Sequence, residues 1–160
     1  MSACGHEHPS APGLRGRTLE AALAAAERRC AQAGERLTAP RRRVLELLLE
    51  AGQPAKAYDL MAAYGAEGGP AKPPTVYRAL EFLARLGLAH RVESLNAFVA
   101  CRLGEASHTA GFLICDCCGA AREIEPVAST EVREAAAASG FALTGMTIEA
   151  HGLCADCAAA

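Results

Sequence analysis

Residues 75–101 read TVYRALEFLARLGLAHRVESLNAFVAC, and their pattern changes from helical to strand-like. Up to Leu86 the apolar side chains recur at helical spacing and share one face. Tyr77 flanks the polar side of this helix, which carries Arg78, Glu81 and Arg85. The first part of the stretch therefore predicts an amphipathic helix with a cationic outer face.

The second part of the stretch predicts a β-hairpin. Gly87 ends the helix, as glycine often does at this position. Residues 88–93 and 97–101 have the composition of short strands and flank the turn Ser-Leu-Asn. A helix followed directly by a hairpin is typical of a winged helix, in which the hairpin is the wing.

Three further helices are predicted before this stretch, over residues 19–33, 38–51 and 55–63. Thr38 is a good N-cap for the second of them. A loop rich in glycine and proline follows over 65–74. Because several short helices precede a hairpin, we expect a winged helix-turn-helix DNA-binding domain over residues 14–93, after a flexible N-terminal tail over 1–13.

The remainder of the chain, residues 94–160, predicts a second, small α+β unit. Strand patterns cover 110–115 and 120–125, a helix pattern covers 126–138, and a last strand pattern covers 141–150. The fold class expected for the whole chain is thus α+β, with a winged helix-turn-helix followed by a small α/β domain.

Charge is distributed unevenly over the 160 residues, although the net charge is only −2. Residues 14–93 carry 13 basic and 9 acidic side chains, whereas residues 94–160 carry 3 basic and 8 acidic ones. A positive first half suggests a polyanionic partner such as double-stranded DNA. The chain has no apolar run of about 18 residues and no signal-peptide pattern, so we expect no membrane association and a cytoplasmic location.

Four of the eight cysteines form two C-x-x-C pairs, Cys115 with Cys118 and Cys154 with Cys157. Structural zinc is commonly held by four thiolates supplied by two such turns. A reducing compartment argues against a disulfide framework, and the second half has few large side chains with which to build a core. These cysteines therefore predict a structural zinc site.

His90, Cys101, His108 and Glu123 form a second group, spread from the wing to the second unit. Each has an ordinary alternative explanation, because isolated histidines are usually surface or core residues and single glutamates are usually solvated. As a set of nitrogen, sulfur and oxygen ligands, they suit zinc. The residues alone leave both interpretations open.

The other cysteines and histidines carry weaker signals. Cys30 is expected to be a small core residue, and Cys117 an unliganded thiol on the cysteine-rich turn. The tail holds a further cluster, Cys4, His6 and His8, for which an ordered metal site is entropically unfavourable.

Three segments together resemble the zinc uptake regulators, a branch of the ferric uptake regulator superfamily. They are KPPTVYRAL (72–80), HRVES (90–94) and IEAHGLCADC (148–157). Iron-sensing members carry a histidine-rich run before the first C-x-x-C, but here Ser107 to Cys115 contains only His108. The thiolate of Cys101 also favours zinc over iron.

The resemblance implies a homodimeric, zinc-dependent repressor that binds operator DNA and controls zinc uptake genes, with a C-terminal dimerisation domain. It implies about two zinc ions per chain: a structural ion at the four cysteines, and a regulatory ion at His90, Cys101, His108 and Glu123. The loop before His108 is one residue shorter than in comparable members. His151 fits the branch pattern without being a ligand, and either orients a nearby thiolate or lies on the surface.

For DNA contact, Arg78 is the prime candidate, because arginine pairs bidentately with guanine from the start of a recognition helix. Thr75 and Tyr77 lie beside it in the sequence. The resemblance also implies Tyr58, whose alternative role is packing in the core. Arg41 is a candidate phosphate contact; it, Arg42, Arg43 and Arg85 are equally consistent with solvated surface charge.

Two other functions are compatible with cysteine and histidine ligands, a zinc enzyme and a redox sensor. A zinc deaminase requires H-x-E with P-C-x-x-C, and the sequence has neither. Four thiolates also leave a zinc ion no open position for a catalytic water, so we expect no enzyme. A sensor of the same fold for another metal, or for thiol oxidation at Cys101 or Cys117, remains the alternative.

Overall fold

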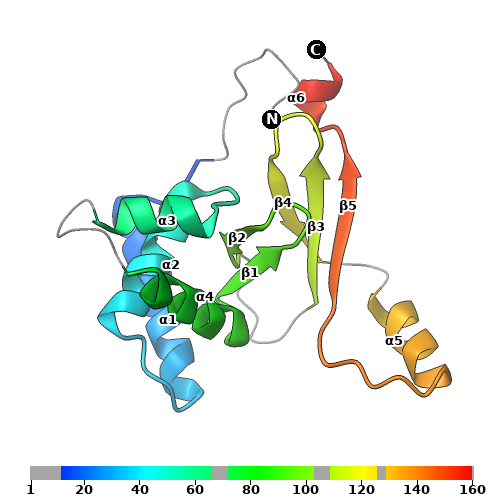
Figure 1. Cartoon of the computed structure of the whole chain (residues 1–160), viewed down its shortest axis with the longest axis horizontal. Helices are drawn as coiled ribbons and strands as arrows, with labels where there is room; N and C mark the ends of the chain where they lie inside the picture. Colours follow the sequence, from blue (N-terminus) through cyan, green and yellow to red (C-terminus); the bar gives the residue numbers. More distant parts are fainter. Residues whose placement is uncertain (1–11, 66–71, 103–108, 126–128, 160) are drawn as a thin grey trace.

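The computed structural model describes residues 12–65, 72–102, 109–125 and 129–159, and Figure 1 shows two units side by side. Four helices form the first unit and a three-stranded sheet forms the second, with a two-stranded hairpin between them. The elements are α1 (Gly16–Gln32), α2 (Ala39–Ala51), α3 (Ala57–Tyr64), α4 (Pro73–Arg85), β1 (Ala89–Val92), β2 (Ala97–Ala100), β3 (Ala110–Cys115), β4 (Ala121–Ile124), α5 (Ser129–Ala138), β5 (Thr147–Gly152) and α6 (Ala155–Ala158). This order confirms the α+β class and the winged helix-turn-helix. No helix among the described residues is long and apolar enough to cross a membrane.

The helical unit is built around the apolar faces of its helices. The apolar face predicted for this helix comprises Val76, Ala79, Leu80, Leu83 and Leu86; the first four are buried in α4, and Leu86, directly after it, is half-buried. The helix α2 begins after Thr38, whose backbone is extended although its side chain makes no capping hydrogen bond, and it ends at Gly52 with φ of +65°. Cys30 is fully buried in this core, as expected. On the opposite side of α4, Tyr77, Arg78 and Glu81 are exposed.

The hairpin pairs β1 with β2 in antiparallel register, and its turn contains Asn96 in the left-handed region at φ of +47°. It is anchored to the helical unit by reciprocal backbone hydrogen bonds between Ala55 and Phe98, at 2.9 and 2.8 Å. The domain boundary expected at residue 93 falls inside the hairpin, so β2 lies after this boundary but is part of the wing.

The sheet of the second unit has the order β4-β3-β5, with β3 and β4 antiparallel and β3 and β5 parallel. The strand predicted over 141–150 is partly wrong, because β5 covers only Thr147–Gly152. Phe141 is exposed, and the segment before β5 pairs with no described strand. The apolar character of this segment therefore belongs to a surface and not to a strand of the sheet. The short helix α6 was not predicted.

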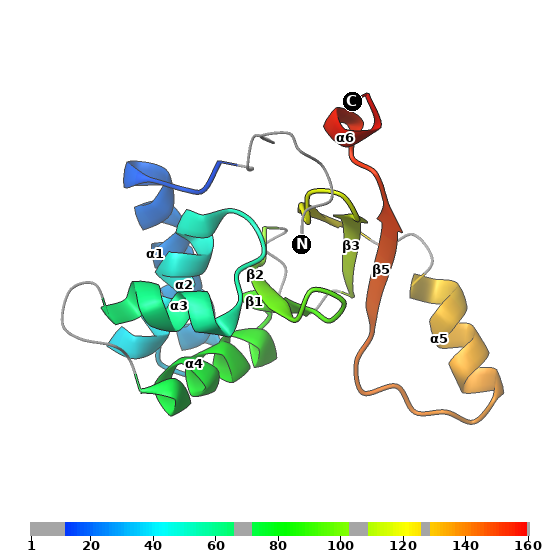
Figure 2. The same cartoon turned by 45° about the horizontal axis from the view of Figure 1, so that its top comes forward.

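A small second core joins the wing to the sheet. It contains Val92 and Val99 from the hairpin and Ala110, Phe112 and Ile114 from β3. By contrast, no described residue of α5 is buried, and the helix stands apart from the sheet in Figures 1 and 2. The wing is therefore packed on the second unit, while α5 presents its surface outward.

Candidate functional site: two metal centres and a nucleic-acid interface

The four C-x-x-C cysteines meet at one end of the sheet. One sulfur atom from each of Cys115, Cys118, Cys154 and Cys157 lies within 4.8 Å of all the others. The Sγ atoms of Cys118 and Cys154 are 3.9 Å apart. Four thiolates at about 2.3 Å from a tetrahedral zinc ion are separated by about 3.8 Å, so this cluster has the dimensions of a zinc tetrathiolate.

Backbone hydrogen bonds bring the two turns together. Cys115 ends β3, and its amide donates to the carbonyl of Ala120 across the first turn, at 2.9 Å. The amide of Asp116 donates to the carbonyl of Gly152 at the end of β5, at 2.8 Å, which places the second turn beside the first. The amide of Cys154 donates to Sγ of Cys115, at 3.3 Å. Parallel pairing of β3 with β5 thus brings together two cysteine turns that are far apart in the sequence.

The pKa values of the cysteines differ strongly. Hydrogen bonds from the backbone of Cys118 and Cys154 lower the pKa of Cys115 to about 6. Burial, together with the neighbouring thiols, raises the pKa of Cys157 far above its ordinary value, and burial also raises that of Cys118. Four sulfurs this close cannot all be anionic without a cation among them, so the donor set fits a divalent, thiophilic metal.

Cys117 does not belong to this cluster. It is disulfide-bonded, so the expectation of a free thiol at this position is wrong. The expectation failed because spacing alone shows that Cys117 cannot share the metal, but not what else its sulfur contacts. Cys4, His6 and His8 lie outside the described residues.

A second cluster lies between the two units, where His90 of β1, Cys101 after β2 and Glu123 of β4 offer ligand atoms within 4.8 Å of one another. Nε2 of His90 is 3.1 Å from Oε1 of Glu123. The other carboxylate oxygen, Oε2, accepts a hydrogen bond from the amide of Arg102 at 2.7 Å. The structure therefore brings together three of the four residues predicted for a regulatory site; His108 lies outside the described residues.

Burial and charge shape this second cluster. The side chains of Glu123 and His90 are 4% and 12% exposed, and the His90 ring packs edge-on against Phe112. Burial alone lowers the pKa of His90, but hydrogen bonds with Cys101 and Glu123 outweigh it and raise that pKa to about 9. The cluster thus stabilises positive charge at its centre. Cys101 and Glu123 also line a cleft of about 1200 Å³.

His151 lies outside both clusters. Its Nδ1 is 2.8 Å from Oδ1 of Asp116, and its Nε2 is 3.9 Å from Oε2 of Glu149. The imidazole is therefore paired with carboxylates at the surface instead of orienting a thiolate. Glu149 is a residue that sequence reasoning missed: it binds the turn of the wing from β5, and no local motif marks it.

The candidate DNA contacts of α3 and α4 differ in their exposure. Tyr58 of α3 is 77% exposed and Tyr77 of α4 is 48% exposed, so Tyr58 is not a core residue. Arg78 is exposed, and Thr75 is half-buried in the first turn of α4. Within the described parts of the chain, Arg78 has no ion-pair or hydrogen-bond partner of its own. Tyr58 and Tyr77 line a pocket of about 430 Å³ together with Lys56 and Arg91.

Arg41 is engaged inside the helical unit. Its guanidinium stacks on the ring of Phe82 at 3.4 Å from the ring centre, and it donates to the carbonyl of Arg36 at 2.7 Å. Arg42, Arg43 and Arg85 likewise pair with glutamates of the same unit. These contacts favour structural roles for the four arginines.

The comparisons with known proteins agree with this geometry. A model of the ferric uptake regulator family matches residues 32–151. The zinc uptake regulation protein of Escherichia coli (strain K12) is 45% identical over 146 residues, which cover 88% of this chain and 83% of the relative. Among solved structures, a zinc uptake regulator complexed with zinc and DNA matches with a TM-score of 0.84 at 44% identity, over 90% of this chain and 97% of that one.

The arrangement of the two units matches one state of a relative better than the other. Holo XcZur matches with a TM-score of 0.79 at 46% identity, over 86% of this chain and 97% of that one. Apo XcZur matches with a TM-score of only 0.50 at 45% identity, over 88% and 97%. The present structure is thus more similar to the holo relative than to the apo relative. With the family model covering most of its length and a relative sharing almost half of its sequence, this chain belongs to the ferric uptake regulator family.

Proposed function

We propose that this protein is a zinc-responsive, dimeric transcriptional repressor, which binds operator DNA when zinc occupies the site of His90, Cys101 and Glu123, and so controls zinc uptake genes. One observation carries the proposal: the ligand atoms of this cluster come from the wing on one side and from the sheet on the other. An ion held there cross-links the two units. His108 is the proposed fourth ligand.

The four cysteines hold the structural ion in this proposal, which makes about two zinc ions per chain. Their sulfur atoms provide a closed tetrahedral set with no position for substrate. We assign this centre to stability and the interdomain site to regulation. The relatives are regulators, and we assign no enzymatic role to this chain.

The regulatory site is coupled to DNA binding through a short path. His90 follows the last residue of α4 by five positions, and α4 presents Arg78 and Tyr77 outward. Fixing His90 against Glu123 therefore fixes the direction of the recognition helix. In a dimer this sets the distance between two recognition helices, which must match the spacing of DNA half-sites. The better match to the holo relative supports this coupling.

The dimer is supported by the unburied surface of the second unit. Val132 of α5, Phe141 and Leu153 are large apolar side chains that are exposed in the single chain. In this proposal, a second copy of the chain covers these side chains and the surface of α5, in which no residue is buried. We therefore assign residues 14–93 to DNA binding and residues 94–160 to dimerisation and metal binding, and we propose a cytoplasmic location.

Native mass spectrometry and DNA selection test the proposal together. We expect a dimer with four zinc ions, which falls to two after a mild chelator while the far-ultraviolet circular dichroism is unchanged. DNA selected from a random pool by the zinc-loaded protein should bind well in zinc and poorly after the chelator. If each chain held a single zinc ion and bound no second one in excess zinc, regulation by zinc would be contradicted. Another metal or thiol oxidation would then be favoured as the signal.

The exposed guanidinium of Arg78 provides a prediction about sequence reading. Arg78→Ala should weaken binding to the selected DNA by about 1–3 kcal/mol and relax the preference at one or two base pairs, because a bidentate contact to guanine is lost. Fluorescence anisotropy on matched and mutated sites measures both effects. Arg43→Ala, which removes a charge paired with Glu46, is the control. Equal affinities for Arg78→Ala and the wild-type protein would remove Arg78 from base reading.

A further inference from the structure

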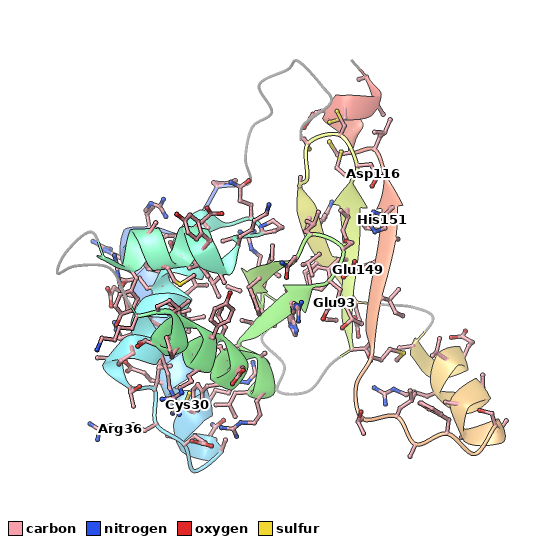
Figure 3. All side chains as sticks on the ribbon, viewed as in Figure 1. Cys30, Arg36, Glu93, Asp116, Glu149 and His151 are labelled. Atoms are coloured by element: carbon pink, nitrogen blue, oxygen red, sulfur yellow. The ribbon has the colours of Figure 1, made fainter. Side chains whose placement is uncertain are left out.

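The wing touches the sheet at a second place, away from both cysteine-containing clusters. Oε1 of Glu149 accepts a hydrogen bond from the amide of Glu93 at 2.6 Å, and Oε2 accepts one from the amide of Ser94 at 3.1 Å. Both amides belong to the turn of the hairpin, and Glu149 lies in β5. In Figure 3, Glu149 and Glu93 lie next to each other where the hairpin meets β3 and β5.

Neighbouring contacts hold this carboxylate in place. Its side chain is only 14% exposed, and in the sheet Glu149 is paired with Phe112, a residue of the small core that joins wing and sheet. Leu95, in the same turn, packs against that core. His151 lies beside Glu149 and is itself held by Asp116, as Figure 3 shows. The two amides therefore face a carboxylate with a fixed position.

The chemistry of this contact favours the charged form of Glu149. Burial alone raises its pKa, but hydrogen bonds from the side chain of Ser94 and from the amides of Glu93 and Ser94 outweigh it and bring the pKa below its ordinary value. Hydrogen bonds from backbone amides to a carboxylate are among the stronger ones in proteins. The contact also contains none of the proposed zinc ligands, so its formation requires no metal.

We propose that Glu149 is a positioning residue of the switch: its carboxylate binds the turn of the wing and holds the wing on the sheet before zinc arrives. The inference rests on the proposed function. His90 and the turn are on the same hairpin, so fixing the turn also keeps His90 close to Glu123. When only a fraction of the molecules is arranged to bind zinc, the apparent dissociation constant for zinc equals the intrinsic constant divided by that fraction. Glu149 therefore sets the zinc concentration at which the regulator responds.

Hydrogen exchange tests the contact without reference to zinc or DNA. In protein that keeps its structural zinc but has an empty regulatory site, Glu149→Ala should make the amides of Glu93 and Ser94 exchange at least about tenfold faster. Glu93→Gln is the matched control: it removes a carboxylate from the same turn, but one that pairs with Arg91 at the surface, and it leaves both amides in place. Exchange as slow in Glu149→Ala as in the control would overturn the proposal.

A zinc titration tests the effect on the switch. The zinc concentration for half-maximal DNA binding should rise about tenfold in Glu149→Ala, less in Glu149→Gln, which keeps one acceptor oxygen, and not at all in Glu93→Gln. At saturating zinc, the DNA affinity of Glu149→Ala should equal that of the wild-type protein, because the ligands and the recognition helix are intact. If the amides exchanged faster in Glu149→Ala but the zinc midpoint were unchanged, the contact would stand and only the positioning role would be overturned. Wild-type DNA binding that ignores zinc would overturn the proposed function, and the exchange experiment would still decide whether the contact exists.

Discussion

Cys154→Ser should abolish zinc binding at the four-cysteine cluster and unfold the C-terminal sheet. Among the described residues, no hydrophobic residue after Cys115 is buried, so β4, β5 and α6 have almost no apolar core of their own. The thiolate cluster joins the turn after β3 to the segment after β5. Structural zinc contributes on the order of 10–16 kcal/mol of apparent binding free energy, which exceeds the stability of most small domains.

Metal analysis and circular dichroism measure this effect in reducing buffer. Zinc content should fall by at least one ion per chain, the strand signal should decrease, and the dimer should be lost, while the helical unit keeps its own transition. Cys117→Ser is the control, because Cys117 lies in the same turn but outside the cluster. A Cys154→Ser protein that retained both its zinc and its thermal transition would contradict a structural role for the cluster.

Cys101→Ser should remove the zinc response while leaving the protein folded. The change deletes one thiolate from the interdomain cluster and alters the side chain by a single atom. Zinc content should fall from two ions to one per chain. In excess zinc, DNA affinity should drop to that of the chelator-treated wild-type protein, a decrease of about 5–150-fold if the coupling is of ordinary size.

A titration of DNA binding against free zinc measures this loss, with thermal unfolding to confirm that the fold persists. Glu93→Gln is the control, because it removes an exposed carboxylate that belongs to neither cluster. A Cys101→Ser protein that still responded to zinc with a normal midpoint would place the sensing site elsewhere.

The helical unit and the four-cysteine cluster were predictable from the sequence because their signals are local or chemically specific. Apolar spacing placed the buried face of α4, and C-x-x-C spacing identified the four cysteines that the structure brings together. The start of β5 was misplaced, because Phe141 is apolar but exposed, and apolar pattern alone does not distinguish a buried strand from a surface that another chain covers. The residue-level evidence for His90, Cys101 and Glu123 was open until the fold brought them together.

The contact between Glu149 and the wing was beyond reach for a different reason. Its partners are backbone amides 56 and 55 positions away, which leave no side-chain signature. A single glutamate in a strand pattern is most simply a solvated residue. Only the parallel pairing of β3 with β5 places it opposite the hairpin, and parallel pairing depends on the whole topology.

The position of His90 only five residues beyond α4 has a practical consequence for engineering such regulators. In the function proposed above, the residues that read DNA project from α3 and α4, whereas the ligands of the interdomain site lie in β1, after β2 and in β4. Substitutions at Tyr58 and Arg78 should therefore alter which promoter is chosen, and substitutions at Glu149 in β5 should alter the zinc concentration of the response. Under this proposal, promoter choice and zinc sensitivity can be engineered at different residues of one chain.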